Sequence, residues 1–273
     1  MPVTRVNGTD LYYEDTGGPD EPIVFLHGFL FDGRQYETQV ASLRDRYRCV
    51  TLDFRGQGKS AASRRGYQIE QHTADVLAVI RRLDIAPVHL VGLSMGGFVA
   101  LRIAAREPSL LRSLTLLNTS AAAHARSKFP KQLILAGVAR VAGVSLPLLR
   151  SGIEAEMYGE AFRKNPTRAA EREVWRQRWA RADRSSLVKT LLGFMIRPDI
   201  RDELGDVTVP TLVIAGGADA SLPPPFSREI HSLVAGSRLV ELPGVGHSSP
   251  VEDPDGVTRA LEQFLNDVRA RRP

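Results

Sequence analysis

The chain has 273 residues, of which 43% are hydrophobic and 25% charged, a balance typical of a globular protein with a substantial core. Its formal net charge is +5, but the arginines are scattered among acidic residues, which favours solvated helix faces over a surface for nucleic acid or membranes. There is no run of eighteen apolar residues and no signal-peptide pattern, and the single cysteine, Cys49, excludes an intramolecular disulfide. We therefore expect a cytoplasmic protein with a buried, structural thiol.

The first part of the chain alternates predicted strands with predicted helices. Asn7-Gly8 between two short alternating runs is a strong hairpin signal. Short apolar runs predict further strands, and stretches with helical periodicity lie between them. The predicted strands are 3–6, 11–13, 23–26, 49–52, 88–91 and 114–117, and the predicted helices are 35–43, 68–83 and 95–106. This alternation indicates crossover connections, and hence a mostly parallel sheet with helices on both faces.

Residues 121–206 differ from the rest because they contain many helix formers, almost no strand signal, and breaks at glycine and proline. We interpret them as a helical lid over the carboxyl edge of the sheet. The alternating pattern then returns, with predicted strands at 211–214 and 238–242 and predicted helices at 224–233 and 255–269. The sequence thus predicts an α/β core of eight strands, formed by residues 1–120 and 207–273, and a lid formed by 121–206.

A short stretch between a predicted strand and a predicted helix, GLSMG (92–96), places Ser94 between two glycines. Ligands of parallel sheets bind at the carboxyl ends of the strands. Glycines leave room for a sharp turn there, and the N-terminus of the following helix favours negative charge. A helix-capping role would explain the serine but not the glycines on both sides. We therefore predict that Ser94 is a nucleophile that attacks a carbonyl group.

A serine nucleophile needs a base, and His247 lies in a glycine-rich loop directly after a predicted strand. The other histidines are 27, 72, 89, 124 and 231; surface, core or loop-shaping positions explain them better, and His124 could at most touch substrate. Asp219 directly follows another strand and is the predicted carboxylate that orients His247, although a turn role before Pro223 would also explain it. Asn118 holds the alternative position for this acid but cannot carry the charge.

An oxyanion formed by this attack needs two hydrogen-bond donors. The turn supplies the Met95 backbone N–H, and the His27-Gly28-Phe29 bend at the same edge supplies the Phe29 backbone N–H. We expect an apolar substrate pocket. Its predicted lining residues are Phe29, Leu93, Leu146 and Leu148.

These residues resemble the α/β-hydrolase superfamily. Five features match in order, and together they span nearly the whole chain: the His27-Gly28-Phe29 loop, DFRGQGKS (53–60), GLSMGG (92–97), the Asp219 loop and the Gly246-His247 loop. The resemblance implies the α/β-hydrolase fold, a lid between the sixth and seventh strands, and no cofactor.

Within the superfamily the chain is similar to small carboxylesterases and enol-lactonases, which implies hydrolysis of a carboxylic ester or lactone through an acyl-enzyme. Carbon–carbon bond hydrolases of ring-cleavage products, cofactor-free haloperoxidases (perhydrolases) and slow-turnover small-molecule receptors stay open as alternatives. Ser94 argues against the dehalogenases and epoxide hydrolases, which use an aspartate nucleophile.

Nucleotide and metal chemistry find little support in the sequence. Gly58-Lys59-Ser60 lacks the glycine of a phosphate-binding loop, since Asp53 stands in its place, and no metal-ligand spacing occurs. We expect no metal site, and a monomer or small homo-oligomer whose partner is a small-molecule substrate, with no nucleic acid and no membrane.

Overall fold

The computed structural model describes residues 2–19 and 21–271; the outermost residues of the predicted core, 1, 272 and 273, lie outside it. It contains an eight-stranded sheet in the order β1-β2-β4-β3-β5-β6-β7-β8. The strands are β1 (Val3–Val6), β2 (Thr9–Asp15), β3 (Pro22–Leu26), β4 (Arg48–Leu52), β5 (Val88–Leu93), β6 (Leu111–Leu117), β7 (Thr211–Gly216) and β8 (Arg238–Leu242). β1 and β2 pair antiparallel, β2 pairs antiparallel with β4, and every later pairing is parallel. The predicted, mostly parallel eight-stranded sheet is confirmed.

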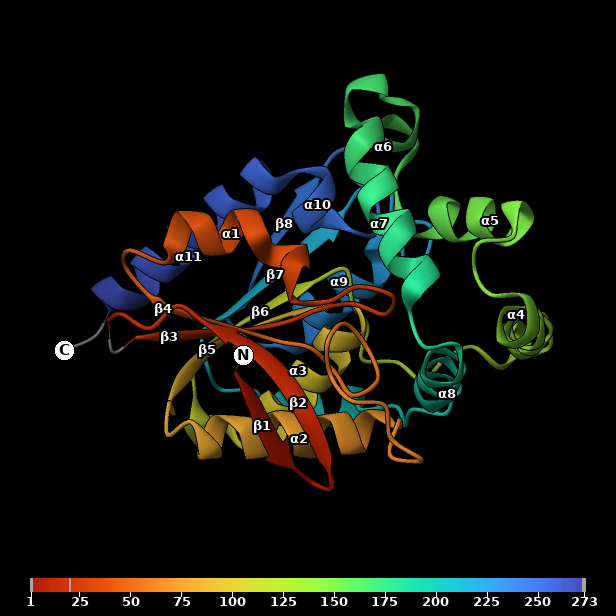
Figure 1. The fold of residues 1–273 in the computed structure, drawn as a ribbon. Coiled ribbons are helices and arrows are strands. Elements are labelled where there is room, and N and C mark those ends of the chain that lie inside the picture. Colours follow the sequence, from red (N-terminus) through yellow and green to blue (C-terminus); the bar gives the residue numbers. More distant parts are fainter. Residues whose placement is uncertain (1, 20, 272–273) are drawn as a thin grey trace.

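Helices cover both faces of this sheet (Figure 1). The helices are α1 (Glu37–Leu43), α2 (Ile69–Arg82), α3 (Met95–Arg106), α4 (Phe129–Ala142), α5 (Pro147–Met157), α6 (Glu160–Lys164), α7 (Ala169–Arg181), α8 (Arg184–Met195), α9 (Pro224–Leu233), α10 (Ser249–Glu252) and α11 (Pro254–Ala270). α1 and α11 pack on one face, and α2, α3 and α9 on the other.

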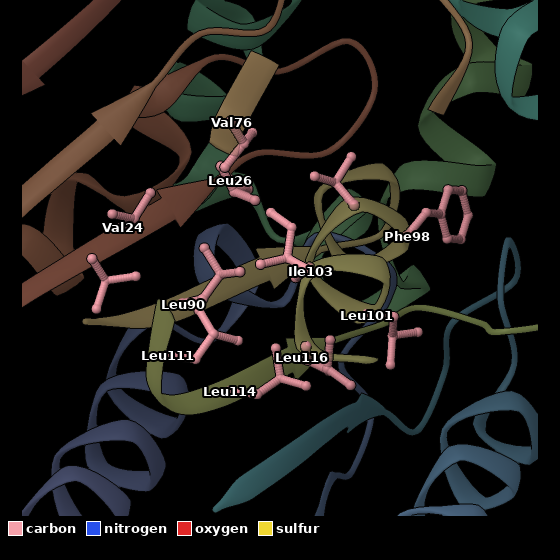
Figure 2. Close-up of a cluster of buried hydrophobic side chains, with 14 of the residues drawn as sticks. Val24, Leu26, Val76, Leu90, Phe98, Leu101, Ile103, Leu111, Leu114 and Leu116 are labelled. Carbon is pink, nitrogen blue, oxygen red and sulfur yellow. The ribbon is translucent and has the colours of Figure 1, made fainter. Parts of the chain in front are cut away.

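The larger apolar cluster fills the space between the sheet and α2 and α3. Figure 2 shows Leu26 and Leu90 of the central strands pointing toward Val76 of α2 and Ile103 of α3. Both strands are buried on two faces, which explains why the sequence there reads as continuous apolar runs rather than as alternation. A second cluster on the other face joins the sheet to α1 and α11 and includes the buried Cys49, where burial raises the pKa of the thiol to about 12.

The strand register aligns the carboxyl ends of the central strands at one edge. Leu26 pairs with Gly92, Leu93 with Leu117, and Leu117 with Ile214. The loops that follow β3, β5, β6 and β7 therefore begin at nearly the same level. This shared edge is where side chains from distant parts of the sequence can meet.

All elements between β6 and β7 are helical, and Figure 1 shows α4 to α8 gathered beyond one end of the sheet. They contact the edge described above, since the Ser248 N–H donates to the Met157 carbonyl oxygen at 3.0 Å. The division into a core and a lid stays a prediction. Within the described ranges, no helix has both the length and the apolar character that crossing a membrane requires.

Candidate active site

Ser94 lies at the apex of a turn that joins β5 to α3, with backbone angles of φ 51° and ψ −111°. A positive φ is uncommon for a residue with a side chain and costs about 1–3 kcal/mol. The turn is held by the Ser94 N–H, which donates to the Leu117 carbonyl oxygen at 2.9 Å, and by the Thr119 hydroxyl, which donates to the Ser94 carbonyl oxygen at 2.8 Å. Surrounding structure thus enforces a strained conformation that presents the serine at the strand edge.

The glycines beside Ser94 are needed because the chain passes very close to itself. A Cβ at Gly92 would lie 2.5 Å from the carbonyl oxygen of Gly96. A Cβ at Gly96 would lie 2.1 Å from the carbonyl oxygen of Leu26, at the end of β3. Both distances are far below contact with backbone that cannot move aside. The glycine pattern therefore reflects the geometry of the turn, and the turn is pressed against the His27–Phe29 loop.

Asp219 and His247 meet at the same edge, after β7 and β8. The Asp219 Oδ2 atom lies 2.8 Å from His247 Nδ1, and both side chains are buried. Asp219 Oδ1 accepts hydrogen bonds from the backbone N–H groups of Ser221 and Leu222, at 2.8 and 2.9 Å. The aspartate thus forms the predicted turn interaction and the predicted histidine contact at once, with one oxygen for each.

Asn118 completes this arrangement from the end of β6. Its Nδ2 donates to Asp219 Oδ2 at 2.9 Å and to the Gly246 carbonyl oxygen at 3.1 Å, and its Oδ1 accepts from the Ser249 hydroxyl at 2.7 Å. The sequence had excluded Asn118 as the acid but assigned it no other role. The structure shows that it orients the acid and braces the His247 loop.

Glu252 of α10 holds the histidine loop from the other side. Its carboxylate accepts the backbone N–H groups of Gly246 and Ser248, which flank His247, and of Gly159 between α5 and α6, at 2.8–3.0 Å. Burial raises the pKa of Glu252, partly offset by these three hydrogen bonds. No sequence motif marked this residue, because its role depends on three backbone groups that only the fold brings together.

The charges around His247 favour its protonated form. Burial by itself lowers the pKa of the ring, but the charge and hydrogen bond of Asp219, with smaller contributions from Glu252 and Glu156, outweigh it. The net effect raises the pKa of His247 above its ordinary 6.5. The site therefore stabilises an imidazolium, which is what a base must become after it accepts a proton.

Ser94 follows β5 at the same edge, with β6 between β5 and β7, but no hydrogen bond joins its hydroxyl to His247 among the described residues. Contacts of this kind often tighten only when substrate is bound. The structure brings Asp219 and His247 together. Ser94 is tied to the same region by the end of β6, where Leu117 binds the Ser94 N–H and Asn118 binds Asp219.

The loop after β3 presents one free backbone donor toward the Ser94 turn. The Gly28 N–H donates to the Gln35 side chain at 2.9 Å, and the Leu30 N–H donates to the Gln57 side chain at 3.2 Å. Between them, the Phe29 N–H has no hydrogen-bond partner within the described part of the chain. A Cβ at Gly28 would lie 3.6 Å from the Ser94 Cβ, so this loop borders the Ser94 turn.

The Met95 N–H is the second predicted donor. Met95 is the first residue of α3, and the first N–H groups of a helix have no partner within it. Both predicted donors thus stand beside Ser94 without a backbone acceptor. The glutamines that fix the Phe29 loop were not identified from sequence, although Gln57 belongs to the DFRGQGKS motif, whose role is therefore to support this loop.

The ring of His27 supports the loop, as predicted, and its hydrogen bonds are with backbone groups. Its Nε2 accepts the Phe54 N–H at 3.0 Å, and its Nδ1 lies 2.7 Å from the Gly28 carbonyl oxygen. Asp53 accepts the N–H groups of Gly33 and Lys59, at 2.7 and 2.8 Å, so it also braces the backbone.

The predicted pocket residues fare differently. Leu93 is fully buried beside Gly28, and Phe29 packs partly buried against the core. Leu148 is 86% exposed and Leu146 40% exposed, so the fold does not enclose either side chain, and their pocket role stays a prediction. The helical pattern of this segment could not reveal which side of α5 faces the sheet.

A cavity of about 340 Å³ lies between α4, α8 and the loop before α2. Its walls include Tyr67, Phe129, Leu133 and Leu192, with Arg64 at its rim, and none of Ser94, Asp219 and His247 lines it. Among the described residues, no group of three or more His, Cys, Asp or Glu side chains is arranged to hold a metal ion.

The chain belongs to the alpha/beta hydrolase family, whose model matches residues 23–260. Solved structures of this class are similar over nearly the whole chain. The enol-lactonase from Burkholderia xenovorans LB400 is 30% identical, with a TM-score of 0.89 over 97% of this chain and 100% of that one. A thermophilic esterase from Thermogutta terrifontis is 29% identical, with a TM-score of 0.88 over 97% of each chain. A bromoperoxidase from Bacillus anthracis is 25% identical, with a TM-score of 0.82 over 94% and 96%. The protein is accordingly a hydrolase of the α/β fold.

Proposed function

We propose that this protein is a serine hydrolase that cleaves a small carboxylic ester or lactone through a Ser94–His247–Asp219 triad. The observation that carries the proposal is the strained turn of Ser94, held by backbone contacts at the edge where the Asp219–His247 pair lies. A capping serine would need no such strain. The similarity to an esterase and an enol-lactonase supports the same class of reaction.

The proposed reaction begins when His247 Nε2 accepts the Ser94 hydroxyl proton as Ser94 Oγ attacks the substrate carbonyl carbon. The N–H groups of Phe29 and Met95 hold the resulting oxyanion. The imidazolium, stabilised by Asp219, then gives its proton to the departing alcohol oxygen as the carbon–oxygen bond breaks. Water attacks the acyl-enzyme with His247 again as base, and the acid product leaves with Ser94 restored.

The test is hydrolysis of p-nitrophenyl esters of increasing acyl length, together with a panel of lactones. Ser94→Ala should lower kcat/KM at least about a thousandfold without loss of folding, because a triad fails as a unit. It should also abolish labelling by a fluorophosphonate. Ser227→Ala is the matched control, since Ser227 is also buried and its hydroxyl makes no hydrogen bond to any described residue. Labelling that persists in Ser94→Ala would place the nucleophile elsewhere.

The same triad could serve two related reactions and a receptor. The similarity to a bromoperoxidase favours including peroxide, acetate and bromide in the panel as a test of perhydrolysis. Ring-cleavage products would test carbon–carbon bond hydrolysis. A single turnover that stops at the acyl-enzyme would identify a slow receptor. A cytoplasmic location stays a sequence-based prediction.

A further inference from the structure

Arg197, two residues beyond the end of α8, is a buried cation that lacks an acidic partner. Only 6% of the residue is exposed, and no carboxylate among the described residues forms an ion pair with it. Burial, and then the charge of nearby Arg102, lower the pKa of its guanidinium to about 10, against a smaller opposite effect of the Asp199 charge, so the side chain is still charged at neutral pH. Asp199 forms its ion pair with Arg201 instead, and a buried charge without an ion pair is unfavourable and needs a reason.

The hydrogen bonds of Arg197 engage only part of its guanidinium. Nη1 donates to the Phe194 carbonyl oxygen at 3.1 Å and lies 3.5 Å from His124 Nδ1. Nε is buried and has no partner, and no hydrogen bond of Nη2 occurs in the described part of the chain. Nε and Nη2 form one edge of the guanidinium, and this edge is the one that binds a carboxylate with two parallel hydrogen bonds.

Two other buried arginines, Arg55 and Arg102, do not share this property. Arg172 does share it, since in the described part of the chain only its Nη1 donates, to the carbonyl oxygens of Phe162 and Asn165. Arg55 pairs with Asp75 through two hydrogen bonds of 2.7 Å. Arg102 donates to Glu70 and to the carbonyl oxygens of Phe98 and Pro198. Both therefore act as structural braces whose donors are used within the fold, whereas Arg197 keeps a free edge.

Arg197 packs against α3, the helix that begins at the Ser94 turn. Its guanidinium carbon is 4.0 Å from the ring centre of Phe98, whose backbone N–H donates to the Ser94 carbonyl oxygen at 2.9 Å. The Phe194 ring contacts both the Phe98 ring and the ring of Phe29, the proposed oxyanion donor, with centroid distances of 6.5 and 5.3 Å. The rings of Phe98, Phe194 and Phe29 thus form a continuous series of contacts from Arg197 to the loop beside the Ser94 turn.

We propose that the free edge of Arg197 binds a carboxylate on the substrate, so that the preferred substrates are esters or lactones that carry a second, ionised carboxyl group. This proposal rests on the proposed function and adds its substrate class. Binding supplies the counter-ion that the fold omits. The aromatic surroundings exclude water, which strengthens such a charge-assisted pair. A lysine could not replace Arg197 fully, because an ammonium group cannot offer two parallel donors.

The test compares paired substrates of equal acyl length. p-Nitrophenyl hydrogen glutarate, adipate and pimelate carry the extra carboxylate, and p-nitrophenyl valerate, hexanoate and heptanoate lack it. The measured quantity is the ratio of kcat/KM for the anionic ester to that for the neutral ester, after subtraction of the uncatalysed rate. Arg197→Met should lower this ratio about 30-fold or more, chiefly through KM, as expected when one member of a buried charged pair is removed.

Arg102→Met is the matched control, because it removes a buried arginine that also contacts Phe98, through the Phe98 carbonyl oxygen, but has its own acidic partner. It should change both kcat/KM values by the same factor and leave the ratio alone. Arg197→Lys should give an intermediate ratio, and it decides the question if Arg197→Met does not fold. A ratio that Arg197 variants leave unchanged, or that Arg102→Met lowers equally, would overturn the proposal and leave Arg197 as a purely structural residue.

A binding measurement separates this proposal from the triad. Calorimetry with adipate and with adipamide, which has the same length but no charge, should show binding of adipate alone, weakened about 30-fold or more in Arg197→Met. No turnover is needed, so the result holds even if Ser94→Ala disproves the triad. Equal affinities for adipate and adipamide would overturn the carboxylate site while leaving the triad to its own test.

Discussion

Asp219→Asn is the sharpest test of the proposed triad because the structure fixes what each atom of the new side chain would meet. Asp219 accepts hydrogen bonds on both oxygens. Oδ1 faces the N–H groups of Ser221 and Leu222, and Oδ2 faces Asn118 Nδ2 and His247 Nδ1. An asparagine side chain has one acceptor oxygen and one NH₂ donor group, so in either orientation the NH₂ group faces other hydrogen-bond donors.

If the asparagine keeps its oxygen on the backbone N–H groups, its NH₂ faces Asn118 and His247. A flip of Asn118 would relieve one conflict but turn its oxygen toward the Gly246 carbonyl oxygen, which it now binds through Nδ2. His247 could accept from the amide only by moving its proton to Nε2, which is the wrong tautomer for a base. Each buried donor left unsatisfied costs about 1–3 kcal/mol, so we expect a loss of stability of about 2 kcal/mol.

The expected loss of kcat/KM is on the order of ten-thousandfold, as in the analogous serine-protease substitution, and about a hundredfold would still support the triad. Ester hydrolysis measures the loss of kcat/KM, and denaturant unfolding measures the loss of stability. Asn118→Ala is the matched control. It leaves Asp219 its charge and three of four hydrogen bonds, so its kinetic loss should be smaller. Near-wild-type activity of Asp219→Asn would remove Asp219 from the triad and require another carboxylate within reach of His247 Nδ1.

Three further outcomes follow from burial and charge. The acid limb of kcat/KM should have its midpoint above pH 6.5, because the raised pKa of His247 protonates the base earlier as pH falls; Glu252→Gln should shift that midpoint downward in a pH–rate profile, and an upward shift would contradict the electrostatic reasoning. His72 is fully buried, and burial lowers its pKa to about 3, with smaller contributions from the charges of Arg55 and His27 and against the effect of a hydrogen bond with the Tyr67 backbone. Below pH 6.5 His72 therefore binds a proton in the unfolded chain but not in the folded chain. The free energy of unfolding decreases as the pH is lowered, by up to about 1.4 kcal/mol per pH unit. His72→Phe should reduce the change of the free energy of unfolding with pH, measured by denaturant titrations between pH 6.5 and pH 4. An unchanged pH dependence would show that His72 is not its cause. Gly137→Ala, in an exposed helix with nothing near the new methyl group, should raise stability by up to about 1 kcal/mol, whereas Gly96→Ala should disrupt the turn; equal melting temperatures for the two variants would refute the steric argument.

The sequence predicted the strands well because short apolar runs and a hairpin signal are local features. β1, β8, α3 and α9 have the predicted limits, and the other strands differ by a few residues at their ends. Ser94, Asp219 and His247 could be proposed from the sequence for a related reason. Each lies in the loop after a predicted strand, and parallel strands bring their carboxyl ends to one edge. Position along the chain therefore translated into position in space.

The residues that the sequence did not reveal act through contacts with distant backbone. Gln35 and Gln57 bind the N–H groups on either side of Phe29, and Glu252 binds those on either side of His247. No periodicity or spacing announces such a contact. Leu148 is a different case, because an apolar residue in a helix suggested a pocket lining, and the packing of α5 leaves it 86% exposed.

The groups to which chemistry is assigned here are the ones that the fold leaves incomplete. Among the described residues, Gly28 and Leu30 have acceptors for their N–H groups, and Phe29 between them has none. In the same described ranges, Arg102 forms an ion pair with Glu70, and Arg197 nearby forms none. In each case the neighbour shows that a partner was attainable, so the vacancy is a local exception to the rule that buried polar groups are satisfied. A substrate with an ester carbonyl and a separate carboxylate would give both groups a partner. The carboxylate would bind Arg197, and the carbonyl oxygen would accept from the Phe29 N–H as that oxygen gains negative charge. Such a substrate would be positioned by Arg197 throughout the reaction, and stabilised by the Phe29 N–H most strongly in the transition state, which is the division that favours a high kcat.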